Sequence, residues 1–414
     1  MAATAAAFLI GWRQVAASFV LLGAIAMITA AYGVIAVPLA QEFQPSRMVL
    51  MLAITVVSAV SGVLAPVLGS LMDRISLRRL MLTGSLLLCA GYAALSFAAT
   101  FNQVLIVFGV LIAPANVLLG PVAVTVLLSR WFVKRRGTAI GIAIAGISMG
   151  GVLFPLLIQF LLESFDWRMA LRVFAVILLF VVVPAAALIV NAPADRGLHP
   201  DGADSESEES RREATKADVS VMTILTDPAF WMIGLLFAIV LSGMKAVVTN
   251  LAPLAIDEGI AAGSAALLVS VYAACGFVSK LSFAVVADML KPRILALIAF
   301  AGFAVGMACL SQAASGFWMI VTGACLAGLF GGFMVPLKSL LAPRVFGQGV
   351  VGRAMGLLST LSLCVSLATP PLFGLMFDLT GSYSLICMVF AGLAAGALVL
   401  VPYIRMQPRQ AALA

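Results

Sequence analysis

Two lysines occupy positions where a chain of this composition rarely carries a charge. Lys280 lies eight residues before Asp288, and Lys245 lies eight residues before Pro253, each within a long apolar run. A helix rises ~1.5 Å per residue, so each lysine is ~12 Å from its helix end and near the middle of a ~30 Å hydrocarbon core. Charged residues at that depth are costly and usually face a wet cavity. The two positions therefore predict a site that uses positive charge.

The acidic residues do not balance these lysines. Every Asp and Glu falls in a loop or near the end of an expected helix. No carboxylate is therefore expected at the depth of Lys245 or Lys280, and an anionic substrate could supply the countercharge. We expect Lys280 to contact that substrate. Lys245 is either a second ligand or a structural lysine bonded to helix carbonyls.

Other polar residues lie near the same depth or at helix ends. The candidates for hydrogen bonds to a carboxylate are Tyr32, Asn116, Asn250 and Tyr272. Each could equally bond a neighbouring helix. Lys338 lies six residues before Arg344, and we expect its amine to extend to the membrane interface. Arg168 and Arg172, at one end of the sixth expected helix, could attract anions, although topology alone explains charges at a helix end.

The residues of common enzyme chemistry are sparse. His199 is the only histidine and lies in the central loop, and the six cysteines fall in apolar runs without metal-ligand spacing. The chain has no phosphate-binding glycine loop of the ATPase type. We therefore expect neither an enzyme nor a metal site, and no cofactor.

The elements that position these residues follow from composition. The chain is 63% hydrophobic and 10% charged, whereas soluble domains carry about 25% charged residues. The apolar runs are continuous and do not alternate, which favours helices over a membrane barrel. The sequence predicts an all-α membrane protein with twelve transmembrane helices. The expected spans are 14–40, 47–72, 79–98, 102–130, 138–163, 168–190, 229–254, 264–288, 293–313, 317–342, 352–377 and 383–404.

Basic residues predict the orientation. With the N-terminus in the cytoplasm, 18 Lys and Arg lie inside and three outside, and three lie within spans. This bias places both termini in the cytoplasm of a multi-pass cell (inner) membrane protein, and it explains the net charge of +7 without a nucleic-acid partner. The expected domains are six-helix bundles at 1–191 and 228–414, joined by a polar, disordered or partly helical cytoplasmic linker at 192–227. We expect a monomer.

The two expected bundles match at a constant offset of 215 residues. The aligned pairs are Pro38 with Pro253, Glu42 with Asp257, Asp73 with Asp288, Arg78 with Arg293, Pro121 with Pro336, Gly137 with Gly352, Gly141 with Gly356, and Pro155 with Pro370. A single gapless offset indicates two pseudo-symmetric repeats. Transporters built this way bind substrate near the bilayer midplane and rock one half against the other.

A charged loop follows the second expected helix. The segment GSLMDRISLRR, from Gly69 to Arg79, resembles the G-x-x-x-D-R-x-x-x-R/K loop of the major facilitator superfamily. The resemblance implies a conformational latch formed by Gly69, Asp73, Arg74 and Arg78, in which the aspartate pairs with arginines. The second copy keeps Asp288 and Arg293 but has Met289 in place of Arg74. We expect this second latch to be weaker.

A narrower resemblance covers three other segments. YGVIAVPLAQEFQPSR (32–47), RWFVKRRGTAIGIAIAGISMG (130–150) and FGLMFDLTGSY (373–383) resemble the monocarboxylate porter and oxalate/formate antiporter group. The resemblance implies secondary active or facilitative transport of small organic anions, mono- or dicarboxylates. Lys280 falls where relatives carry a substrate-binding Arg on helix eight. Proton-coupled porters also carry an Asp one turn earlier, where this chain has Gly276, and this difference favours anion exchange or facilitated diffusion.

Two other functions fit the same helices. A glycine-rich fifth helix also occurs in drug exporters, so export of neutral or anionic drugs is the main alternative. A sensor that binds a ligand without transporting it is the other. A substrate panel in reconstituted vesicles separates these possibilities.

Overall fold

A computed structural model describes residues 2–30, 32–45, 47–202 and 221–403. Helices form its regular structure, and these residues contain no strand. Eleven helical segments are long and apolar enough to cross a membrane. The remaining predicted span, α4, carries Arg78 and Arg79 in its first turn, and these charges lower its mean hydropathy. The predicted all-α membrane fold is confirmed.

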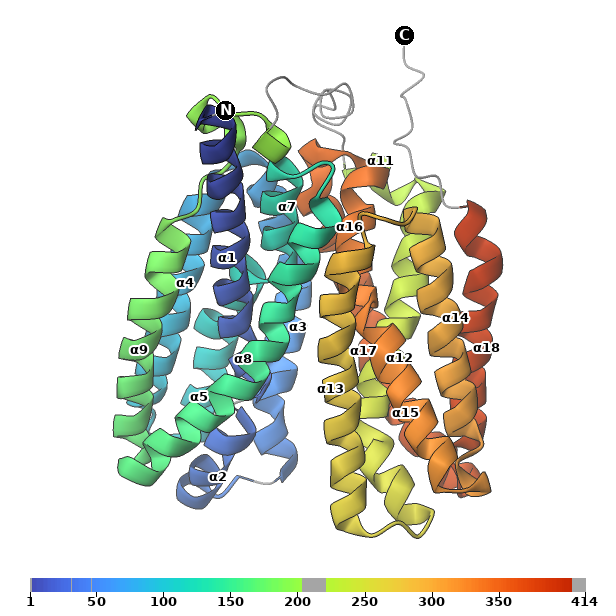
Figure 1. Ribbon diagram of the computed structural model, residues 1–414. Coiled ribbons are helices and arrows are strands. Elements are labelled where there is room, and N and C mark those ends of the chain that lie inside the picture. Colours follow the sequence, from blue (N-terminus) through green and yellow to red (C-terminus); the bar gives the residue numbers. More distant parts are fainter. Residues whose placement is uncertain (1, 31, 46, 203–220, 404–414) are drawn as a thin grey trace. The chain divides into compact units, whose positions relative to one another are not determined.

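Two compact units divide the chain. Unit 1 comprises residues 1–218 and 347–357, and unit 2 comprises 219–346 and 358–414. The helices of unit 1 are α1 (Ala2–Ala30), α2 (Tyr32–Phe43), α3 (Arg47–Arg74), α4 (Leu77–Leu95), α5 (Phe101–Val107), α6 (Ala113–Leu119), α7 (Pro121–Trp131), α8 (Arg136–Ser164) and α9 (Trp167–Ala187). Figure 1 shows α1 beside α8 and α4 beside α9, which are its most extensive packing pairs.

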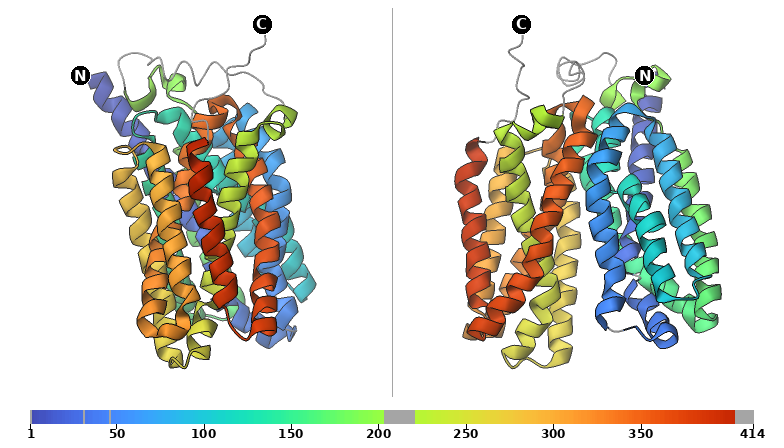
Figure 2. Two further views of the ribbon diagram at one scale, coloured as in Figure 1. Left: turned by 90° about the vertical axis from the view of Figure 1, so that its right-hand side faces the viewer. Right: turned by 180° about the vertical axis from the view of Figure 1, so that it is seen from behind.

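Unit 2 is a second bundle of long helices. Its helices are α11 (Val221–Leu225), α12 (Pro228–Asp257), α13 (Ala262–Val286), α14 (Pro292–Ser311), α15 (Phe317–Gly332), α16 (Met334–Phe346), most of α17 (Val351–Thr380), and α18 (Ser384–Leu400). The main packing pairs are α14 with α15, α14 with α18, and α13 with α15. Figure 2 shows this bundle from two further sides, in yellow to red. Helix α17 begins in unit 1 and continues into unit 2 from Leu358.

Capping side chains begin several helices where the sequence turns polar. Ser76 accepts a hydrogen bond from the backbone of Arg79 and starts α4, and Thr100 does the same for α5. Asp166 caps α9, and Asp227 caps α12. These side chains satisfy amides that a helix cannot pair in its own first turn.

The predicted span 102–130 is not one regular helix. A π-helical turn at Phe108–Ile112 joins α5 to α6, and the backbone of Gly120 is extended between α6 and α7. A Cβ at Gly120 would lie 2.4 Å from the carbonyl oxygen of Asn116, so a larger residue would clash with the preceding turn. Such irregular turns often occur at functional positions in helices.

Close packing in unit 1 depends on small residues. A Cβ on Gly146 would lie 2.2 Å from the carbonyl oxygen of Phe19, and one on Gly150 would lie 2.1 Å from that of Gly23. The absence of a side chain lets the backbones of α1 and α8 come together.

The segment after α9 is fixed to the helix ends of unit 1. The backbone N–H of Val190 donates to Gln14, and the indole of Trp131 donates to the Val190 carbonyl at 2.8 Å. Further on, the carboxylate of Asp201 accepts hydrogen bonds from three successive backbone amides, 133–135. The first part of the predicted linker is therefore anchored through Gly202, and residues 203–220 lie outside the described chain.

Candidate functional site

The three lysines expected within spans all belong to unit 2. Lys245 is exposed on α12, twelve residues before that helix ends, and Lys280 is half-buried on α13. Lys338 is on α16 and is only 8% exposed. Positively charged groups from three different helices are thus held within one bundle.

The prediction that Lys338 extends to the membrane interface is wrong. Nearly every residue of α16 is buried, including the residues on either side of Lys338. Helix α16 packs against α12, α14 and α15, and the side chain of this lysine is buried. Spacing along one helix gives the distance of Lys338 from the helix end but cannot show whether neighbouring helices bury it.

The acids of unit 2 lie far from these positions along the helices. Its acidic residues are Asp227, Asp257, Glu258, Asp288 and Asp378. Each caps a helix, lies within three residues of a helix end, or lies in a connecting turn. The middle turns of the unit 2 helices therefore carry basic residues and no acidic ones.

Two of the predicted polar ligands in unit 2 use their donors within the protein. The hydroxyl of Tyr272 on α13 donates to the carbonyl of Met244 on α12, at 3.4 Å. The amide of Asn250 donates to the carbonyl of Ala246 at 2.9 Å and to Thr249 at 3.0 Å. Tyr272 therefore links α13 to α12 beside Lys245.

The two predicted ligands in unit 1 also bond neighbouring turns and helices. The hydroxyl of Tyr32 donates to the carbonyl of Leu50, and its ring contacts Phe108 edge-on. The amide of Asn116 donates to the hydroxyl of Ser61 at 3.1 Å. Unit 1 thus holds Tyr32 and Asn116, and unit 2 holds Lys245, Lys280, Asn250 and Tyr272.

The predicted latch centres on Asp73, near the end of α3. Its carboxylate accepts hydrogen bonds from the backbone amides of Gly352 and Arg353, both at 2.8 Å. Asp73 thus caps the first turn of α17, where the exposed amides and the helix dipole favour a negative charge. A Cβ on Gly69 would lie 2.1 Å from the carbonyl oxygen of Gly352, so only glycine permits this approach.

Two arginines from other helices also lie near Asp73. The positive charges acting on Asp73 include Arg130 and Arg353. Arg130 also donates to the carbonyl of Met72 at 3.1 Å. Arg74 and Arg78 are exposed, and the backbone amide of Arg78 donates to Asn191.

Sequence reasoning did not assign the α17 segment to the latch. The available signal was the repeat itself, because Gly352 and Gly356 align with Gly137 and Gly141. A Cβ on Gly356 would lie 2.2 Å from the carbonyl oxygen of Ala65 on α3. In the second copy, Asp288 lies in the turn after α13 and Arg293 lies in the first turn of α14.

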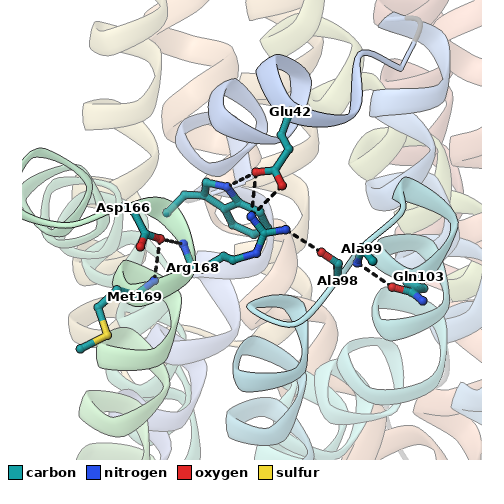
Figure 3. Close-up of polar contacts among 8 residues, drawn as sticks. Glu42, Ala98, Ala99, Gln103, Asp166, Arg168 and Met169 are labelled. Carbon is teal, nitrogen blue, oxygen red and sulfur yellow. Dashed lines mark hydrogen bonds and ion pairs between the residues drawn. The ribbon is translucent and has the colours of Figure 1, made fainter.

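The opposite end of unit 1 carries an ion pair (Figure 3). Arg168 contacts the carboxylate of Glu42 at 2.6 Å and also donates to the carbonyl of Ala98 at 3.0 Å. The indole of Trp167 donates to the same carboxylate. Arg172 donates to the hydroxyl of Ser96 and lies over the ring of Phe97. Both arginines therefore join helix ends of unit 1.

Comparison with known proteins places these features in context. Residues 15–258 and 239–413 match the family model described as Major Facilitator Superfamily. Monocarboxylate transporter 11 of Homo sapiens is 28% identical over 384 residues, covering 90% of this chain and 78% of its own length. Monocarboxylate transporter 12 of Mus musculus is 25% identical over 374 residues, covering 83% of this chain and 76% of its own length.

Solved structures show the same fold. A xylose transporter variant, XylE with two introduced tryptophans, superposes with a TM-score of 0.74 at 14% identity. The match covers 98% of this chain and 97% of that structure. The resemblance to the superfamily and to its monocarboxylate group is confirmed.

Proposed function

Because this chain belongs to the Major Facilitator Superfamily, and is thus a multi-pass membrane transporter, we propose that its substrates are small organic anions. The class is mono- or dicarboxylates, moved by alternating access. Lys280 is the principal ligand of the substrate carboxylate, and Lys245 assists it. The relatives named as monocarboxylate transporters support this class.

The charge distribution in unit 2 carries the proposal. Three lysines lie within its spans, whereas its acids lie at helix ends and in turns. A substrate carboxylate that enters this region gains charge-assisted hydrogen bonds, which are stronger than neutral ones. A cationic substrate would instead meet like charge. The same distribution disfavours cationic drugs as cargo.

The residue one turn before Lys280 bears on the coupling mode. Gly276 places no carboxylate beside the lysine, and a Cβ there would have only one neighbouring atom within 4 Å, at 3.7 Å. Anion exchange or facilitated diffusion therefore fits this chain better than symport through a membrane carboxylate. The basic-residue bias supports an inner-membrane location with both termini in the cytoplasm.

Counterflow in proteoliposomes tests the proposal. Proteoliposomes that contain the purified protein are loaded with unlabelled carboxylates. Uptake of labelled carboxylates is then measured at several pH values. Lys280→Met should raise the half-saturation concentration by about tenfold or more, because a hydrogen bond to a charged group contributes roughly 1.5–3 kcal/mol. Lys280→Arg, which keeps the charge, should retain part of the affinity.

A matched control separates local from general effects of charge. Lys291 belongs to the same unit but lies at the start of α14, so Lys291→Met should leave transport unchanged. Unchanged carboxylate uptake by correctly folded Lys280→Met would refute the role of Lys280. Flux of neutral or anionic drugs without any carboxylate flux would favour the drug exporter instead.

A further inference from the structure

Lys245 and Lys338 lie on two helices that pack against each other in antiparallel directions. Phe230, near the start of α12, contacts Phe346, the last residue of α16, with ring centroids 6.4 Å apart. From this shared level, Lys338 is eight residues back along α16 and Lys245 is fifteen residues forward along α12. These spacings correspond to ~12 Å and ~22 Å, so the two residues differ in level by ~10 Å.

The directions of the side chains reduce this difference in level. Helical side chains lean toward the N-terminus of their own helix. Lys338 therefore leans away from Phe346 and toward the level of Lys245, and Lys245 leans back toward the level of Lys338. The positive charge of Lys245 acts on Lys338, as expected for two ammonium groups that converge.

The described residues supply no countercharge to this pair. Among the described residues, the ammonium groups of Lys245 and Lys338 have no hydrogen bond or ion pair. No acid of unit 2 lies in the middle turns of a helix. Two converging cations without an acid form a site for an anion.

Lys280 lies on α13, which also packs against α12. Tyr272 contacts the residue before Lys245, and Lys280 follows Tyr272 by eight residues, or ~12 Å, along α13. Lys280 and Lys338 are thus each ~10–12 Å from the level of Lys245, in the same direction. A substrate with two separated anionic groups can engage positive charge on both α13 and α16.

We propose that Lys245 and Lys338 form a second anion site, which binds one carboxylate while Lys280 binds another, so that dicarboxylates are the preferred substrates. This inference rests on the proposed function and narrows its substrate class. The second site includes Lys338, a buried lysine of unit 2, in addition to the lysines of the proposed function. A monocarboxylate can use only one of the two sites.

Uptake of labelled succinate and labelled lactate, measured separately in proteoliposomes of the full chain, tests the proposal. Wild-type protein should take up succinate with a lower half-saturation concentration than lactate. Lys338→Met should raise the value for succinate tenfold or more and change that for lactate less than threefold. Lys338→Arg should restore much of the succinate affinity, and Lys291→Met serves as the charge control in the same unit.

The outcomes are distinguishable. Lactate transport without succinate transport overturns the second site and leaves the carboxylate carrier standing, whereas transport of neither overturns both. Equal loss of lactate and succinate affinity in folded Lys338→Met also overturns the second site. If Lys338→Met does not give monodisperse protein, Lys245→Met decides, because the exposed side chain of Lys245 can be replaced without disturbing the core.

Discussion

The cap that Asp73 provides for α17 yields a quantitative prediction. Replacing Asp73 by alanine removes the acceptor of two backbone amides at 2.8 Å. Loss of a helix cap costs about 0.5–2 kcal/mol, and loss of a negative charge near a helix N-terminus costs about 0.3–1 kcal/mol. A total of roughly 1–3 kcal/mol shifts the equilibrium for opening the contact between Asp73 and the first turn of α17 by roughly 5–150-fold.

Hydrogen exchange measures this opening directly. The amides of Gly352 and Arg353 exchange only when the contact opens, so Asp73→Ala should accelerate exchange in a peptide covering 347–357 by that factor. Asp73→Asn, which keeps the shape but loses the charge, should give an intermediate rate. Glu163→Ala is the control, because Glu163 is an exposed acid at the far end of α8. An unchanged rate in Asp73→Ala would show that the carboxylate does not hold this segment.

Three further predictions concern packing, the ion pair and coupling. Gly150→Ala should lower the melting temperature by several degrees, because overpacking costs about 1–3 kcal/mol. Gly151→Ala should leave it unchanged, because no atom lies within 4 Å of the new Cβ. Equal melting temperatures of the two variants would contradict the close packing of α1 and α8. Double-mutant cycles with Glu42→Gln and Arg168→Gln should show a small coupling that high salt weakens, as for other exposed ion pairs, and a salt-independent coupling would contradict this interpretation. Gly276→Asp should make carboxylate uptake increase as the external pH falls, because protonation removes the new negative charge beside the substrate lysine; a flat pH profile would count against that site.

Much of the fold follows from the order of residues alone. Long apolar runs predict spans because each helix satisfies its own backbone hydrogen bonds in lipid. The repeat at an offset of 215 residues predicts which positions are equivalent in the two halves. The distance of Lys280 and Lys245 from the ends of their helices can also be predicted, because rise per residue converts spacing into distance along one helix.

The partners of individual side chains were decided by tertiary packing. Asp73 has arginines close by in sequence, yet it caps α17, almost 280 residues later in the chain. Arg168 could serve an anion by its sequence position, yet Glu42 occupies it. Lys338 is near a helix end by spacing, yet its side chain is buried. Depth is a property of a single helix, whereas burial and pairing depend on which helices meet and with which faces, and in this protein only the folded bundle specifies those contacts.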